Sequence, residues 1–137
     1  MGDPRPLRLR NVTVDARDPR ALAEFYRRLT GWAYTPGHET VDPAGDDWLS
    51  LQVPGGASRL AFQRSDAEVP TWPGGARVHV DLDVPDLAAG HERALACGAR
   101  PLTGTPEDEG HPDDLFRVYA DPEGHPFCLS SPPLDHP

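Results

Sequence analysis

The stretch VHVDLDVPD, residues 78–86, alternates strictly between apolar and polar side chains. Val78, Val80, Leu82 and Val84 share one parity, while His79, Asp81 and Asp83 share the other. An alternation with period 2 predicts a strand whose aliphatic face packs against the core and whose polar face meets water or a ligand. This polar row is the first candidate for a functional site.

Each half of the chain follows the same order of elements. In the first half, the alternating stretch LRLRNVTVDA predicts a strand. A helix follows, with Asp18 as its N-cap, an apolar stripe along one side and Gly31 as its stop signal. The β-prone runs GWAYTPG, DDWLSLQVPGG and SRLAFQRS come next. In the second half Asp86 caps the helix LAAGHERALACG, on which Leu87, Ala94 and Leu95 are expected on one side, and the runs RPLTGTP, LFRVYADPEG and PFCLSS follow.

A shift of 68 residues superimposes the two halves. It places Asn11 over His79 and Asp18 over Asp86, so a strand parity and a helix cap coincide. We therefore expect one domain over residues 1–137 with module one at about 7–65, a linker at 66–75 and module two at about 76–131.

Composition excludes several classes of function. The net charge of −9 disfavours nucleic acid and anionic membranes as partners, and all 13 basic residues are Arg, so Schiff-base chemistry on a lysine is ruled out. No apolar run is long enough to span a membrane, and we expect a cytoplasmic protein. Cys97 and Cys128 lack CxxC spacing and are expected to be buried thiols.

Three segments together resemble the glyoxalase, bleomycin-resistance and extradiol-dioxygenase group, the vicinal oxygen chelate superfamily. They are VTVDARDPRALAEFYRRLTGW, HVDLDVPDL and DPEGHPFCLSS. The resemblance implies an α+β fold in which two paired βαβββ modules curl eight strands into a half-barrel, with helices outside and a small-molecule cleft inside. On this expectation His79, Asp81 and Asp83 line the cleft.

Metal-dependent members of this superfamily take four ligands from the first and last strands of the modules. Carried over by position, these fall on Asn11, Gln63, His79 and Cys128, of which only His79 is a strong ligand. Two amides, an imidazole and a thiol suit no hard cation, so we expect no metal cofactor. A zinc or iron site remains the alternative, with Asp81, His111 or His125 as substitute ligands.

The candidate site comprises His79 and Asp81 as catalytic bases and Asn11, Trp48, Gln63 and Cys128 as ligand-binding residues. Three of them also have a simpler interpretation. His79 can be a hydrogen-bonded lining residue, Asp81 and Asp83 can hold an Arg or a backbone amide, and Cys128 can be inert filler. If Cys128 contacts His79, it can instead be a thiolate nucleophile.

The predicted function is binding of a small organic molecule without metal, either to sequester it or to catalyse proton transfer on it. The alternative is a metal-dependent lyase, isomerase or dioxygenase of the same superfamily, in which an ion polarises the substrate's oxygens. The resemblance also implies a homodimer. The acidic stretch TPEDEGHPDDL lies in the connection over residues 103–115, which is expected to be a solvated loop and alternatively a lid over the cleft.

Overall fold

A computed structural model describes residues 9–41, 46–56, 58–66, 79–102 and 116–131 of the chain. The chain forms two compact units, Met1–Asp66 and Ala67–Pro137, which contain module one and module two respectively. The predicted linker lies almost entirely outside the described residues.

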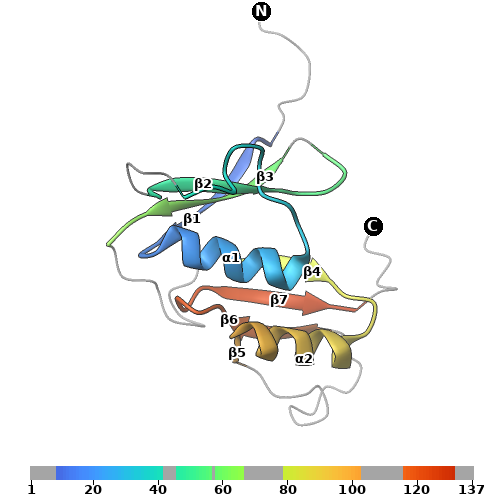
Figure 1. Cartoon of the computed structure of the whole chain (residues 1–137). Coiled ribbons are helices and arrows are strands. Elements are labelled where there is room, and N and C mark those ends of the chain that lie inside the picture. Colours follow the sequence, from blue (N-terminus) through green and yellow to red (C-terminus); the bar gives the residue numbers. More distant parts are fainter. Residues whose placement is uncertain (1–8, 42–45, 57, 67–78, 103–115, 132–137) are drawn as a thin grey trace, which may run out of the picture. The chain divides into compact units, whose positions relative to one another are not determined.

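Module one is a three-stranded mixed sheet with one helix. Its elements are β1 (Asn11–Ala16), α1 (Pro19–Thr30), β2 (Trp48–Gln52) and β3 (Arg59–Arg64). The strand order is β1-β3-β2, with β1 parallel and β2 antiparallel to β3. In Figure 1, α1 runs along one face of this sheet. The core between them includes Tyr26 of α1, whose ring stacks at 5.7 Å on that of Phe62 in β3.

The helix signals read from the sequence are confirmed in α1. The Asp18 side chain accepts a hydrogen bond of 3.1 Å from the backbone N–H of Ala21, and Pro19 opens the helix. Gly31 ends it with φ of 77°, a left-handed conformation that favours glycine. The predicted stripe is buried and consists of Leu22, Phe25, Tyr26 and Leu29.

The run GWAYTPG forms less strand than expected. Within the described residues it contributes one isolated antiparallel bridge, Tyr34 to Leu51, although Thr35 N–H still donates to the carbonyl of Ser50 at 3.0 Å. A regular antiparallel ladder would continue with a hydrogen bond from Ser50 N–H to a backbone carbonyl of this run. Here Ser50 N–H donates instead to the ring Nδ1 of His38. A side chain therefore ends the pairing at this edge.

Module two repeats the strand–helix–strands order of module one and forms a four-stranded sheet. Its elements are β4 (Val80–Asp83), α2 (Leu87–Cys97), β5 (Arg100–Pro101), β6 (Phe116–Ala120) and β7 (Pro126–Ser130). The order is β4-β7-β6-β5, and β4 runs parallel to β7 while the other pairs are antiparallel. Tyr119 and Phe127 stack at 5.5 Å between ring centroids on the face that α2 covers.

Asp86 and Gly98 cap the two ends of α2, and Ala94 on its predicted side is buried, but Leu95 on the same side is not. Leu95 is exposed, whereas Gly90 and Ala94 are the buried positions. The absence of a side chain at Gly90 allows the helix to approach Val84, since a Cβ there would lie 3.0 Å from Val84 Cγ1. The prediction for Leu95 was wrong because close contact at a glycine set the rotation of the helix.

The predicted α+β class is confirmed, with one helix on each of two mixed sheets. The eight-stranded half-barrel stays a prediction, because the described residues contain three strands in one sheet and four in the other. Among the described helices, none has the length and apolar character needed to cross a membrane.

Candidate functional site

The face of the module one sheet that α1 leaves open is largely polar. Strand register places Trp48, Gln63 and Asp15 side by side in one row. Ser50, Ala61 and Thr13 form the next row, and Gln52, Arg59 and Asn11 form the third. Three predicted ligand-binding residues thus share this open face: Asn11, Trp48 and Gln63.

The register also separates two of these residues. Asn11 lies opposite Arg59, four positions along β3 from Gln63, which corresponds to roughly 13 Å at the usual rise of a strand. These two amides therefore do not meet as a ligand pair. The Oδ1 atom of Asn11 is buried, and it has no hydrogen-bond partner among the described residues.

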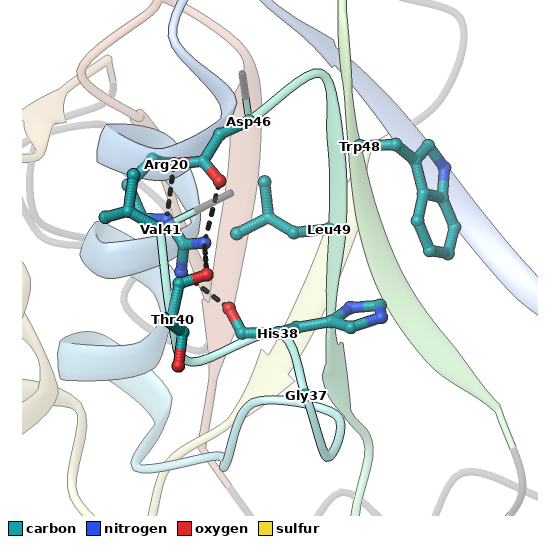
Figure 2. A pocket seen from close by; sticks show the side chains of 8 residues that line it. All are labelled: Arg20, Gly37, His38, Thr40, Val41, Asp46, Trp48 and Leu49. Carbon is teal, nitrogen blue, oxygen red and sulfur yellow. Dashed lines mark hydrogen bonds and ion pairs between the residues drawn. The ribbon is translucent and has the colours of Figure 1, made fainter. Parts of the chain in front are cut away.

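A cavity of about 330 Å³ opens beside Trp48 in module one (Figure 2). Its wall comes from the start of α1, the segment before β2 and the start of β2, and consists of Arg20, Gly37, His38, Thr40, Val41, Asp46, Trp48 and Leu49. Arg20 fixes this wall, because its guanidinium binds the carboxylate of Asp46 and the backbone carbonyls of His38 and Thr40.

His38 is oriented within this wall by two contacts. Its Nδ1 accepts a hydrogen bond of 3.0 Å from Ser50 N–H, which requires the ring proton to reside on Nε2 in the neutral form. Its ring meets Trp48 edge to face at 5.7 Å, and Trp48 keeps 41% of its surface exposed. Sequence reasoning missed Arg20 and His38, since neither belongs to a motif and only the tertiary contacts reveal them.

In module two, the open face of the sheet brings three predicted residues together. Asp81 of β4 pairs with Cys128 of β7, and His79 precedes β4 on the same face. The Nε2 atom of His79 lies 3.2 Å from Oδ1 of Asp81. One ligand atom from each of His79, Asp81 and Cys128 falls within 4.8 Å of the others.

The Cys128 thiol is held in its protonated form. Burial, the negative charge of Asp81 and a hydrogen bond to Asp81 together raise its pKa to about 12. A nucleophilic cysteine needs the opposite shift, since the thiolate is the reactive species. The surroundings of Cys128 therefore work against the thiolate interpretation.

Gln63 and Cys128 do not occupy equivalent positions of the two modules. At the shift of 68 residues, Thr13 of module one corresponds to Asp81 of module two. Thr13 pairs with Ala61 on β3, whereas Asp81 pairs with Cys128 on β7, so Cys128 corresponds to Ala61. Asp15 and Asp83 likewise pair with Gln63 and Ser130. The ligand positions carried over from the superfamily thus fall on two different rows of the repeated sheet.

The donor types decide which metal the module two cluster suits. One imidazole, one carboxylate and one thiol match zinc in type and number, whereas Mg²⁺ and Ca²⁺ prefer several oxygen ligands. A thiol must lose its proton to bind a metal, and the pKa of Cys128 opposes that loss. Any ion here would be held by His79, Asp81 and Cys128.

Other predicted candidates have different roles or lie elsewhere. The ring Nδ1 of His125 lies 3.2 Å from Oδ1 of the buried Asp121, which also accepts the backbone N–H groups of Glu123 and His125. This arrangement stabilises the turn between β6 and β7. His111, and with it the whole acidic connection over residues 103–115, lies outside the described residues.

Residues 11–130 match the model of the glyoxalase-like domain. The chain belongs to this family, within the vicinal oxygen chelate superfamily that the sequence motifs resemble. No functionally curated protein matches the chain.

Solved structures are similar over most of the chain. A glyoxalase/bleomycin resistance protein/dioxygenase family enzyme from Burkholderia phytofirmans PsJN is 20% identical with a TM-score of 0.65, covering 88% of this chain and 95% of that one. A glyoxalase-related enzyme from Fulvimarina pelagi is 22% identical, with a TM-score of 0.63 and coverages of 93% and 89%. A glyoxalase family protein from Enterococcus faecalis is 20% identical, with a TM-score of 0.63 and coverages of 90% and 96%. At these identities the likeness establishes the fold.

Proposed function

We propose that this chain binds a small organic molecule on the open face of the module two sheet and, without a metal, moves a proton on it with His79. The observation that carries the proposal is the contact of 3.2 Å between His79 Nε2 and Asp81 Oδ1 on the open face of module two. An imidazole held by a carboxylate is the usual unit of general acid–base chemistry.

The two residues would have different tasks. His79 would take the proton from the bound molecule, while Asp81 would orient the ring and balance the charge that the ring acquires. Both side chains remain accessible, at 40% and 65% exposure, so a ligand can reach them. The protonated thiol of Cys128, on the neighbouring strand β7, is a neutral group that hydrogen-bonds to Asp81.

Module one offers a separate surface of its own for a small molecule. Trp48 offers an exposed indole next to a cavity, and large apolar rings with a few polar groups are typical of small-molecule sites. Among the described residues, the open faces carry Asp15, Asp81 and Asp83 against Arg59, which disfavours an anionic ligand. The homodimer and the cytoplasmic location belong to the same proposal, and light scattering of the purified chain tests the first.

The test starts from a thermal-shift panel of aromatic polyketides, the glutathione hemithioacetal of methylglyoxal and bleomycin, since binding raises apparent stability by mass action. For any compound that binds, exchange of its acidic C–H in D₂O is then followed by NMR. We expect His79→Gln to slow this exchange by about 10²-fold or more, the usual contribution of a general base, while leaving affinity within a few-fold.

Asp83→Asn is the matched control, because Asp83 lies on the same strand face two residues beyond Asp81 and outside the cluster. It should leave exchange unchanged, whereas Asp81→Asn should slow it. Binding with equal exchange in the wild type and His79→Gln would overturn the catalytic half of the proposal and leave sequestration. Failure of every compound to shift the unfolding temperature would overturn both halves.

The second candidate is the metal-dependent lyase, isomerase or dioxygenase, favoured by the three ligand atoms within 4.8 Å of one another. A zinc ion there would act as a Lewis acid on the oxygens of a substrate. Elemental analysis of the purified protein with and without chelator separates the candidates. One equivalent of zinc that Cys128→Ser abolishes, together with loss of turnover on chelation, would replace our proposal with this one.

A further inference from the structure

Arg117 of β6 is a buried cation on the side of the module two sheet that faces α2. It pairs across the sheet with Leu129 and shares its face with Tyr119, whose hydroxyl contacts His91 of α2. Only 9% of the Arg117 surface is exposed. This face is opposite to the one that carries His79, Asp81 and Cys128.

The guanidinium of Arg117 lacks a counter-ion among the residues that the structure describes. Its Nε is fully buried and has no hydrogen-bond partner there, and no described carboxylate forms an ion pair with it. Its contact is a cation–π interaction with Tyr119, 5.9 Å from Cζ to the ring centroid. Burial of a charge without an opposite charge is costly, so this arrangement favours the arrival of an anion.

Two further groups border the same place. The Nδ1 atom of His91 lies 2.7 Å from the Tyr119 hydroxyl, and their rings are 5.7 Å apart. Burial and then the positive charge of Arg117 lower the pKa of His91, against a smaller opposite effect of the neighbouring Glu92, so the neutral imidazole is favoured. An anion near both side chains would favour protonation of His91 and gain a second positive partner.

We propose that Arg117 and His91 form a binding site for a small oxyanion, a carboxylate or a phosphate, on the α2 side of module two. The planar guanidinium presents paired N–H donors that match the geometry of both anions. This site is separate from the proposed acid–base pair, because the β-sheet lies between them.

The experiment uses the full chain and inorganic phosphate or acetate, at constant ionic strength maintained with NaCl. In the wild type, the urea midpoint should rise with phosphate and saturate, as binding to the folded state requires. Arg117→Gln should weaken phosphate binding at least tenfold and abolish the rise. The parallel acetate titration distinguishes a phosphate site from one for carboxylates.

Arg100→Gln is the matched control, since Arg100 is an exposed arginine on the neighbouring strand β5, and its variant should keep the full phosphate response. In phosphate-free buffer we expect Arg117→Gln to be at least as stable as the wild type, because it removes a buried charge that no described carboxylate pairs with. His91→Gln leaves the guanidinium in place and provides a second variant, with a several-fold weaker response expected.

The NMR signal of the His91 ring provides a second measurement. It would not respond to phosphate if Arg117 had a purely structural role. Saturating phosphate should raise the pH at which His91 titrates in the wild type and not in Arg117→Gln. A wild type that responds to neither anion beyond the NaCl control, or an Arg117→Gln variant that responds like the wild type, would overturn the site. Neither outcome bears on exchange catalysed by His79, so the two proposals fail independently.

Discussion

Arg20 and Asp46 form a bidentate ion pair in module one. Nε of the guanidinium lies 2.9 Å from Oδ2 of the carboxylate, and Nη2 lies 2.9 Å from Oδ1. The same guanidinium donates from Nη1 to the carbonyl of His38 at 2.7 Å. In Figure 2 these bonds converge on one side chain from the first turn of α1. One arginine thus fixes the segment that carries His38 and the start of β2.

Asp46→Asn should destabilise the protein by about 1–3 kcal/mol, the usual range for a hydrogen-bonded charged pair. Both side chains are mostly buried, at 21% and 15% exposure, so solvent screens the pair little. Urea unfolding measures the change. Asp47→Asn, an exposed neighbour, should shift stability by only a few tenths of a kcal/mol. Equal losses in both variants would mean that the ion pair adds nothing.

Glu24 should contribute a pH-dependent part of the stability. A hydrogen-bonded Arg27 and then the Tyr34 hydroxyl, which donates at 2.6 Å, lower the pKa of this carboxyl to about 2 from its usual 4.5. The folded state therefore binds the proton less readily than the unfolded chain. The contribution of Glu24 is complete above about pH 4.5 and is lost as the pH falls towards 2.

Glu24→Gln tests this dependence through urea midpoints at pH 5 and pH 3. We expect the variant to lose less stability than the wild type over this interval, because it has no carboxylate to protonate. Glu92→Gln, at the corresponding position of α2, controls for removal of a helical carboxylate. Parallel pH profiles of the wild type and Glu24→Gln would show that the ion pair has no net effect.

Cys128 should resist alkylation. With its pKa at about 12, roughly one thiol in 10⁴ is ionised at pH 8, and only the thiolate reacts. Iodoacetamide should modify Cys97, which is less buried, at least tenfold faster, as mass spectrometry of the folded protein can show. Asp81→Asn should speed the reaction at Cys128 several-fold, because the charge of Asp81 helps raise that pKa. A fast reaction at Cys128 in the wild type would contradict the protonated thiol.

Gly90→Ala should lower stability although alanine is the better helix former by roughly 1 kcal/mol. A Cβ at this position would lie 3.0 Å from Val84 Cγ1 and 3.2 Å from its Cβ, so a rotation of the Val84 side chain cannot relieve the contact. We expect a net loss of about 1–3 kcal/mol, typical of overpacking. In a Val84→Ala background the same substitution should cost less, and a double-mutant cycle measures the coupling. Additive effects of the two substitutions would mean that there is no steric conflict between position 90 and Val84.

The local signals in the sequence determined both helices and the order of the elements, although the run GWAYTPG formed only an isolated bridge. Asp18 and Gly31 mark the ends of α1, and Asp86 and Gly98 mark those of α2, because capping depends on residues within one turn of the helix end. The alternation over residues 78–86 likewise placed His79 and Asp81 on one face, since side chains on a strand alternate whatever the strand's neighbours are.

Tertiary structure alone decided which side chains meet. The pairing of β4 with β7 set Asp81 against Cys128, and burial together with that carboxylate raises the pKa of the thiol. The separation of Asn11 from Gln63 followed from the register of β1 on β3. Register, helix rotation and the reach of a long arginine depend on contacts between residues far apart in the chain. For this reason the roles of Leu95, Arg20 and Arg117 could not be derived from local sequence patterns, because each is fixed by what packs against it.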